Sequence, residues 1–448
     1  MRIAVVGSGI SGLVCARLLS RRHEVILFEA ERQLGGHVNT VDVKLVDEQL
    51  ERPIDTGFIV YNERTYPNFS KILTDLNVST TPTSMSFSVR CDITGLEYNG
   101  TSLNGVFAQR RNLLRPSFHR LLRDILRFNR EGCADYQQVP ETQTVGEYLA
   151  QRGYSPQFSK QYLLPMGAAI WSCPCDDFAG FPIRFILQFY VNHGLLSLRD
   201  RPTWRVIRGG AIQYVNRLAR PFADCVRLNC PVRAVRRLNG QVRVRHAGGD
   251  ERFDEIVFAC HSDQALRILG DADSLETELL SAFPYNQNTA VLHTDASVLP
   301  RQRRAWASWN YHITRDRGTR PTVTYNMNML QHIRSPHTFC VTLNHSTVID
   351  PEKVIGTFRY AHPQFTVKRA SAQRRHDELI RRRHTSFCGA YWRNGFHEDG
   401  VVSALAVCQK YGIPDWTSET RERIADRRLR ISPPVVAASP VSSVGEQL

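Results

Sequence analysis

The chain has 448 residues, of which 42% are hydrophobic and 22% charged, and it carries a formal net charge of +14. This length is more than one hydrophobic core usually holds, so we expect two domains. No run of 18 apolar residues occurs, and glycines interrupt the apolar stretch at the start. We therefore expect neither a transmembrane helix nor a signal peptide.

The eleven cysteines are odd in number and lack repeated metal-ligand spacing, so we expect buried free thiols, no metal site and a cytoplasmic protein. Cys173 and Cys175 form a single C-x-C pair, for which a metal or redox role is the alternative. Positive charge gathers in residues 110–130 and 366–384. Such charge suits nucleic acid, but no nucleic-acid module accompanies it, and we expect no nucleic-acid partner.

The first 36 residues follow the pattern of one βαβ unit. Residues 3–6 predict a strand, residues 13–21 a helix and residues 25–29 a second strand. Between the first strand and the helix, residues 7–12 read Gly-Ser-Gly-Ile-Ser-Gly, a G-x-G-x-x-G motif. A strand before this motif and a helix after it are typical of a dinucleotide-binding loop.

Each residue type in this loop suits a dinucleotide. Gly7 permits the tight turn, Gly9 lets backbone N–H groups approach a pyrophosphate, and Gly12 lets the helix pack closely on the strand. The pyrophosphate then lies at the helix N-terminus, where free N–H groups favour an anion. Glu29, 17 residues after Gly12, suits a ribose diol.

The residues after Glu29 distinguish FAD from NAD. They read Ala-Glu-Arg-Gln-Leu-Gly-Gly-His and end at Gly35, Gly36 and His37. This segment resembles the flavin-containing amine oxidase superfamily, which includes protoporphyrinogen oxidase and phytoene desaturase. Its members carry E-x-x-x-x-x-G-G-(R/H) after the second strand. The resemblance implies non-covalent FAD, with the glycine pair along its pyrophosphate.

Later segments extend the resemblance to the whole chain. Residues 54–61 match a D-x-G segment near the flavin, where Asp55 either caps a turn or lies beside the cofactor. Residues 385–405 match the last strand and the helix that points at the flavin ring. The implied cofactor-binding residues are Gly7, Gly9, Ile10, Ser11, Gly12, Glu29, Ala30, Gly35, Gly36, His37, Gly57, Phe58, Val232, Gly389, Glu398, Asp399 and Gly400.

The expected fold is α/β: a Rossmann-like FAD-binding domain of the three-layer ββα type, interleaved with an α+β substrate domain. We assign residues 1–76, 204–270 and 385–417 to the FAD-binding domain. Residues 77–203 and 271–384 then form the substrate domain. Residues 418–448 alternate charges and become rich in Ser, Pro and Val, which predicts a disordered tail.

Two departures from the superfamily bear on the reaction. Ala390 follows the glycine of the last strand, where many amine oxidases have an acid, and residues 288–295 lack the lysine found near their flavin. Simple amine oxidation is therefore disfavoured. Segments 57–63, 305–311 and 395–400 resemble a bacterial subgroup of NAD/FAD-binding proteins, often partners of cyclopropane-fatty-acid-synthase-type enzymes. This resemblance implies a hydrophobic, lipid-related substrate.

The predicted function is that of an FAD-dependent oxidoreductase that moves hydride from a substrate C–H bond to flavin N5. The alternatives are a flavin-dependent desaturase or isomerase of an isoprenoid or acyl chain, and a non-catalytic flavin-binding redox sensor. No catalytic base stands out, and no oligomeric state is predicted. Motif position alone suggests Tyr61, Tyr391, His397 and Glu398 as catalytic candidates.

Two further segments have alternative interpretations. Residues 165–171 are apolar and rich in small side chains, which suits either a ligand-facing wall or plain core. Residues 116–131 predict a helix with one apolar face. The arginines beside that face either are solvated or contact an anionic membrane, which would make the protein peripheral to the inner face of the membrane. These arginines are Arg120, Arg123, Arg127 and Arg130.

Overall fold

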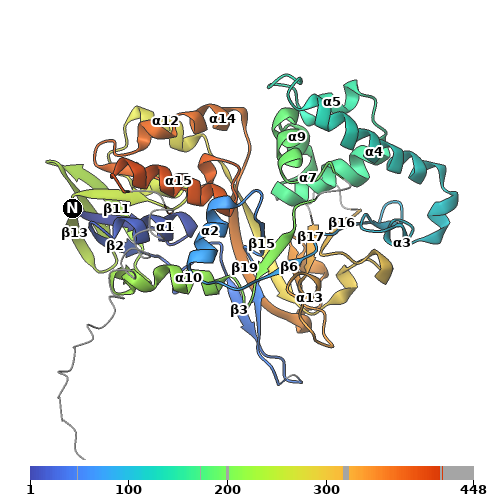
Figure 1. Cartoon of the computed structure of the whole chain (residues 1–448), viewed down its shortest axis with the longest axis horizontal. Helices are drawn as coiled ribbons and strands as arrows, with labels where there is room; N and C mark the ends of the chain where they lie inside the picture. The colour runs from blue at the N-terminus through green and yellow to red at the C-terminus, as the bar shows by residue number, and fades with distance from the viewer. Residues whose placement is uncertain (48, 172, 198–200, 316–321, 414–415, 417–448) are drawn as a thin grey trace, which may run out of the picture.

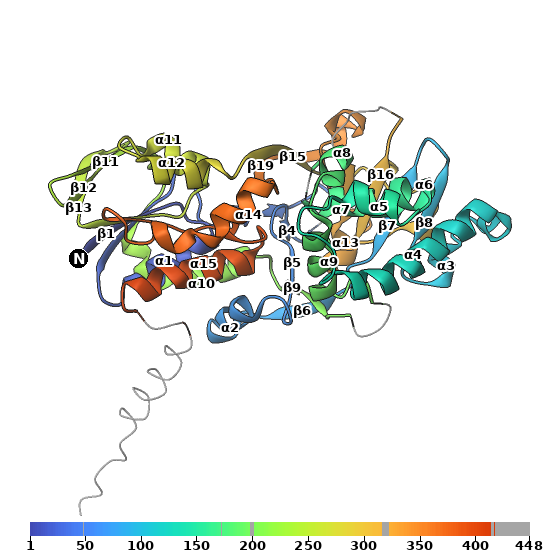
Figure 2. The ribbon, with the colours of Figure 1, turned by 90° about the horizontal axis from the view of Figure 1, so that it is seen from above.

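The computed structural model describes residues 1–47, 49–171, 173–197, 201–315, 322–413 and 416. The tail predicted at residues 418–448 lies outside the described residues. The molecule is elongated, with the N-terminal βαβ unit in one lobe and a helical cluster in the other (Figures 1 and 2). Long strands between the lobes connect them, so each lobe draws on distant parts of the sequence.

The first lobe is built on a five-stranded parallel sheet. Its strands in order are β10 (Val226–Arg227), β2 (Glu24–Phe28), β1 (Arg2–Val6), β14 (Glu255–Phe258) and β20 (Thr385–Phe387). Strands β1 and β2 are almost entirely buried, as in a parallel sheet covered on both faces. The βαβ unit predicted for residues 1–36 is therefore present, at the centre of this sheet.

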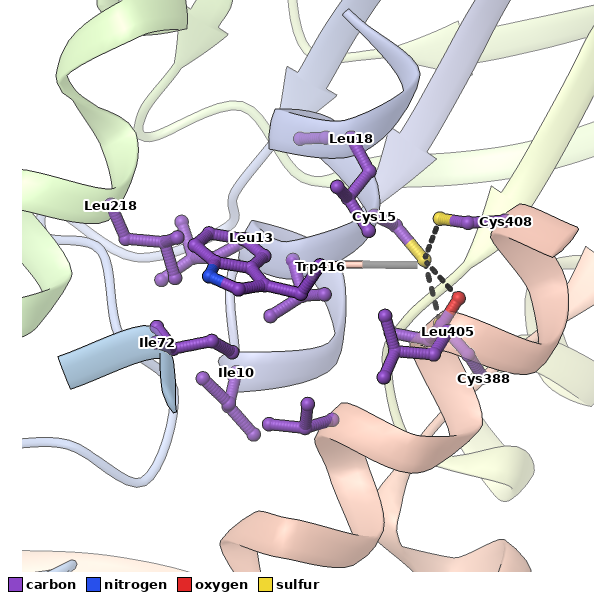
Figure 3. Packing of buried hydrophobic residues seen from close by; sticks show 14 of the residues in the cluster. Ile10, Leu13, Cys15, Leu18, Ile72, Leu218, Cys388, Leu405, Cys408 and Trp416 are labelled. Atoms are coloured by element: carbon purple, nitrogen blue, oxygen red, sulfur yellow. Dashed lines mark hydrogen bonds between the residues drawn. The ribbon is translucent and has the colours of Figure 1, made fainter. Parts of the chain in front are cut away.

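One face of the sheet is covered by helix α1 (Ile10–Leu19), every residue of which is buried. Helices α10 (Ile212–Ala219) and α15 (His397–Lys410) pack against α1. The buried indole of Trp416 lies beside Leu13 and Leu218 (Figure 3). In the same core the Cys15 sulfur lies 3.7 Å from that of Cys388. These contacts fix α1, and with it the glycine loop that precedes it.

The other face of the sheet packs against an antiparallel three-stranded sheet and two helices. Its buried strand residues contact Val242, Val244 and Phe253 of that sheet and Leu279 of a helix. The elements are β11 (Val232–Leu238), β12 (Gln241–His246), β13 (Gly249–Phe253), α11 (Ser262–Ile268) and α12 (Ser274–Ser281). The lobe is thus a three-layer structure, as expected for a Rossmann-like fold.

A seven-stranded mixed sheet runs from between the lobes into the second lobe. Only its pair β7–β16 is parallel. The strands in order are β19 (Val354–Pro363), β15 (Tyr285–His293), β18 (Cys340–Leu343), β17 (Thr322–Asn326), β16 (Trp309–Ile313), β7 (Phe87–Cys91) and β8 (Leu96–Asn99). Strands β7 and β8 form a hairpin whose turn spans residues 92–95, and Asn99 is the last residue of β8.

Helices cover the far side of this sheet and form a large apolar core. They are α3 (Leu103–Val106), the 3-10 helix η1 (Arg110–Leu114), α4 (Pro116–Asp135), α5 (Val145–Gln151), α6 (Pro156–Phe158), α7 (Leu164–Trp171), α8 (Cys175–Ala179) and α9 (Ile183–Asn192). Helix α4 contains the predicted helix 116–131 and extends four residues beyond it. No helix among the described residues is long and apolar enough to span a membrane.

Short strands and one helix link the lobes. They are β3 (Thr40–Val43), β4 (Arg52–Asp55), β5 (Val60–Asn62), α2 (Pro67–Asp75), β6 (Thr80–Thr83) and β9 (Trp204–Ile207). Asp55, at the end of β4, accepts hydrogen bonds from Thr40 Oγ1 (2.6 Å) and the Ala211 N–H (2.9 Å). Burial raises the pKa of Asp55 to about 7. Asp55 thus fastens a turn, which was one of its two predicted roles.

Candidate active site

A cavity of about 1490 Å³ extends from the glycine loop of the first lobe to the helices of the second. At one end its lining comes from residues 6–11, 28–33 and 35–37. At the other end it comes from residues 83–87, from α7 and α9 and from β19. A single continuous space therefore joins the predicted dinucleotide loop to the helical lobe.

Two glycines of the loop are required by the protein itself. Gly7 has φ +100°, a conformation that disfavours other residues. A Cβ on Gly12 would lie 1.9 Å from the Gly7 carbonyl oxygen. Gly7 therefore makes the tight turn, and Gly12 permits the close approach of helix and loop, in the roles that the motif predicts.

Gly9 differs from both, because nothing in the chain requires a glycine there. Its φ of −61° and ψ of 175° are open to any residue, and a Cβ would have no neighbour within 4 Å. That open space belongs to the cavity, which Gly9 lines. No side chain caps the N-terminus of α1, so its N–H groups remain available to an anion. The loop therefore fits a pyrophosphate lying against Gly9.

Glu29 lies at the same end of the cavity as the glycine loop. Its side chain is only 8% exposed but lines the cavity. One carboxylate oxygen accepts hydrogen bonds from the Ser8 N–H (2.9 Å) and hydroxyl (2.5 Å), and the other accepts one from the Glu31 N–H (2.9 Å). These bonds fix the carboxylate in place, where its remaining lone pairs suit the donors of a ribose diol.

Most of the predicted cofactor residues meet at this cavity. Those that line it are Gly7, Gly9, Ile10, Ser11, Glu29, Ala30, Gly35, Gly36, His37, Gly57, Phe58, Val232 and Gly389. Gly12, Glu398, Asp399 and Gly400 do not line it. The Glu398 carboxylate instead accepts hydrogen bonds from the N–H groups of Asn68 (3.1 Å) and Phe69 (2.9 Å) at the start of α2. The Gly400 carbonyl accepts one from Ser11 Oγ at 3.0 Å, so these two residues hold helices in place.

Of the four catalytic candidates, some line the cavity and others do not. Tyr61 and Glu398 do not line the cavity, since Tyr61 is buried against Phe69. Tyr391 lines it but is 3% exposed. The ring of His397 stacks on Phe58 with centroids 3.6 Å apart, and its Nε2 lies 2.9 Å from the Tyr214 hydroxyl. Of the four, His397 is the one whose ring is both held and presented to the cavity.

A cluster of histidines lines the middle of the cavity and was not predicted as a group. The His37 ring centroid lies 5.7 Å from that of His261 and 5.4 Å from that of His362. Burial, with the neighbouring His37, lowers the pKa values of His261, His362 and His397 to about 3. Burial also lowers the pKa of His37. These rings are therefore neutral at physiological pH. The available signal for His362 was the alternation Phe358-x-Tyr360-x-His362, which faces one side of a strand.

We expect this cluster to make the protein sensitive to acid. The folded-state pKa values of His261, His362 and His397 lie below the unfolded value of about 6.5. The unfolded chain therefore takes up protons first as the pH falls below 6.5, and the folded state loses stability down to about pH 3. Each histidine costs up to about 2 kcal/mol at pH 5.

The thermal midpoint, measured between pH 7 and pH 5, checks this expectation. His362→Asn should flatten the decline, whereas His119→Asn, at an exposed position, should leave it unchanged. A midpoint that stays constant over this range would contradict the neutral cluster.

The second end of the cavity is mainly apolar, although Thr83, Ser84 and Ser86 also line it. Its walls include Met166, Ile170 and Trp171 of α7. The other residues of segment 165–171 are buried and do not line the cavity, so this segment is part wall and part core. The remaining apolar lining residues at this end include Met85, Phe87, Phe189, Trp204, Trp309, Tyr325, Leu343, Phe358, Phe365 and Phe396. Among the described residues no lysine lines the cavity, and its only acids, Glu29 and Glu31, lie at the dinucleotide end.

A dinucleotide loop that opens into an apolar chamber defines a flavoprotein oxidoreductase architecture. The chain belongs to the flavin-containing amine oxidoreductase family, whose model matches residues 10–305. The FAD predicted from residues 29–37 is the cofactor of this family, and the glycine loop and Glu29 fit it.

Individual relatives are distant. The chain is 26% identical over 265 residues to the "Putative flavin-containing monoamine oxidase AofH" of Mycobacterium tuberculosis. This alignment covers 57% of the chain and only 56% of that relative. Among solved structures, a fatty acid isomerase from P. acnes that produces CLA aligns with a TM-score of 0.65 at 15% identity, over 90% of this chain and 96% of the other. Cyclohexylamine oxidase from Brevibacterium oxydans aligns with a TM-score of 0.63 at 16% identity, over 92% and 99%. These likenesses confirm the predicted α/β fold.

Proposed function

We propose that this protein is an FAD-dependent oxidoreductase that takes hydride from a C–H bond of an uncharged, hydrophobic small molecule. The observation that carries the proposal is the apolar end of the cavity, which has aromatic and aliphatic walls and no acidic residue among its described lining. When bound, FAD supplies the hydride acceptor, flavin N5.

The chain's own residues position both molecules. The N-terminus of α1 and Gly9 bind the pyrophosphate, and Glu29 binds the ribose. Trp171 and Phe189 form walls that orient an apolar substrate and exclude water. An ammonium ion would lose its hydration there without a carboxylate to replace it, which is costly. The cavity therefore favours a neutral substrate over an amine cation.

A second function, isomerisation or desaturation of an acyl chain, is supported by a separate observation. Arg201 and Arg359 are exposed yet line the cavity. A fatty acid would place its carboxylate on these arginines at the rim and its chain against the apolar walls. Isomerisation leaves the flavin oxidised after turnover, so product analysis separates it from net oxidation.

The test is anaerobic mixing of the purified holoprotein with candidate substrates, followed by the flavin absorbance and by mass spectrometry of the products. The panel contains unsaturated fatty acids, carotenoids and amines. We expect an uncharged or fatty compound to bleach the flavin or to be isomerised. Bleaching by amines alone would overturn the substrate assignment, and no reaction with any compound would favour the redox sensor.

A matched pair of variants makes the test specific. Ile170→Asp places a charge in the apolar wall, so it should slow reduction by a hydrophobic substrate and leave the bound flavin spectrum intact. Val46→Asp, at a fully exposed position, should react like the wild type. Equal rates for both variants would show that the substrate does not use this wall.

A further inference from the structure

Four large apolar side chains are exposed at one end of the helical lobe. Ile93 is 60% exposed, Leu103 79%, Leu113 49% and Leu114 89%. They belong to the β7–β8 turn, α3 and η1, at the tip of the second lobe (Figures 1 and 2). We call these four residues the apolar tip. Such side chains are normally buried, so an exposed group of them indicates a surface that meets another apolar phase.

The segments that carry the tip are tied together. Gln109 Nε2 and Arg111 Nη2 donate hydrogen bonds to the Gly95 carbonyl at 2.8 and 2.9 Å, which holds η1 against the β7–β8 turn. The His119 ring lies 2.7 Å from the Leu113 carbonyl and joins η1 to α4. Helix α3 also contacts the 3-10 helix η5 (Arg303–Ala305). The apolar tip is therefore an ordered surface built from neighbouring elements.

The surroundings of the tip are strongly basic. Residues 98–123 contain five arginines and no acidic residue, and η5 adds Arg303 and Arg304. Arg120 and Arg123 are exposed, and among the described residues neither has a carboxylate partner. Arg127, one of the four arginines first considered for membrane contact, instead pairs with Glu131 at 2.9 Å. Arg130, further along α4, is also exposed and has no carboxylate partner among the described residues. Arg120 and Arg123 are the two that lie at the start of α4, next to η1.

We propose that the apolar tip docks on an anionic lipid bilayer. The leucines and Ile93 enter the acyl boundary, while the surrounding arginines contact lipid phosphates, as in interfacial protein segments. Charge complementarity selects this occupant, because the segment 98–123, with five arginines and no acidic residue, matches a negative membrane. Asp92, next to Ile93, is paired with Arg90 and His312. Arg90, Arg301 and Arg303, together with Asp92, also line a second cavity of about 850 Å³, which is large enough for a phosphate headgroup.

The tip adjoins the active-site cavity. Thr101 lines that cavity, and Leu103, two residues later, is the exposed leucine of α3. When the protein is docked, the part of the cavity wall formed by Thr101 would therefore lie close to the bilayer. A hydrophobic substrate resides in that bilayer. This step rests on the proposed function, whereas docking itself does not.

The experiment is co-sedimentation of the FAD-loaded protein with vesicles of phosphatidylcholine, with or without phosphatidylglycerol, at low and high salt. We expect binding only to the anionic vesicles, weakened by salt. Arg120→Gln with Arg123→Gln should weaken binding about fivefold per arginine. Leu103→Ser with Leu113→Ser and Leu114→Ser should weaken it at least about tenfold.

A control at the opposite end of the molecule keeps the test specific. Leu238 is 56% exposed on β11, and Arg233 and Arg245 are exposed on the same sheet. Leu238→Ser with Arg233→Gln and Arg245→Gln should bind like the wild type, and the flavin spectrum checks that every variant is folded.

Absence of binding to anionic vesicles would overturn the proposal, as would tip variants that bind like the wild type. Self-association through the tip, seen as a leucine-dependent dimer in gel filtration without vesicles, would also overturn it. Flavin reduction by a soluble short-chain substrate is measured separately. If the wild-type protein does not bind vesicles but its flavin is still reduced, only the membrane proposal is rejected. If it binds vesicles but its flavin is not reduced, only the proposed function is rejected.

Discussion

Replacing Gly9 with valine is expected to abolish FAD binding and to leave the protein folded. A Cβ at this position meets no atom of the chain within 4 Å, and the backbone angles suit any residue. The valine side chain would instead occupy the cavity where the loop approaches the pyrophosphate. We expect the affinity for FAD to fall by at least about a hundredfold.

Titration of the apoprotein with FAD, followed by flavin fluorescence, measures the loss, and circular dichroism checks the fold. Gly100→Val is the matched control, since a Cβ on Gly100 also has no neighbour within 4 Å but Gly100 does not line the cavity. It should bind FAD normally. A folded Gly9→Val protein with one FAD per chain would show that the loop does not hold the pyrophosphate.

Gly12→Val, unlike Gly9→Val, should destabilise the fold itself. Its Cβ would lie 1.9 Å from the Gly7 carbonyl oxygen and 3.1 Å from the Ala259 Cβ. Backbone atoms cannot yield as a flexible side chain does, so α1 must move away from the sheet. We expect a loss of about 3 kcal/mol or more in the free energy of unfolding.

Urea unfolding followed by circular dichroism gives this value. Gly12→Ala carries the same Cβ and should also be destabilised, whereas Gly9→Ala should be as stable as the wild type. If the alanine variants were equally stable, the close contact between α1 and the loop would not exist in solution.

The dinucleotide end of the site could be predicted from the sequence because its signals are local. A glycine loop between a strand and a helix requires only a few adjacent residues, and Glu29 follows at a fixed distance in the same βαβ unit. The residues of this unit that we predicted to contact the cofactor line one cavity, with the exception of Gly12. Gly12 instead permits the close packing of α1 on the loop. Helix 116–131 was equally predictable, since its apolar period is strong.

The rest of the site depends on contacts between distant segments, which no local pattern encodes. His37, His261 and His362 come from three separate parts of the sequence and meet only when β19 packs beside the first lobe. Glu398 looked catalytic from its motif position, yet the fold uses it to hold the start of α2.

The most direct measurement is the identity of the cofactor in the purified protein. Mild denaturation should release it, since the binding is non-covalent, and mass spectrometry with absorbance gives its nature and amount. The glycine loop, Glu29 and the cavity of about 1490 Å³ predict FAD, at about one per chain. Release of FMN or NAD alone would contradict the assignment of the cavity, and with it the proposed hydride transfer.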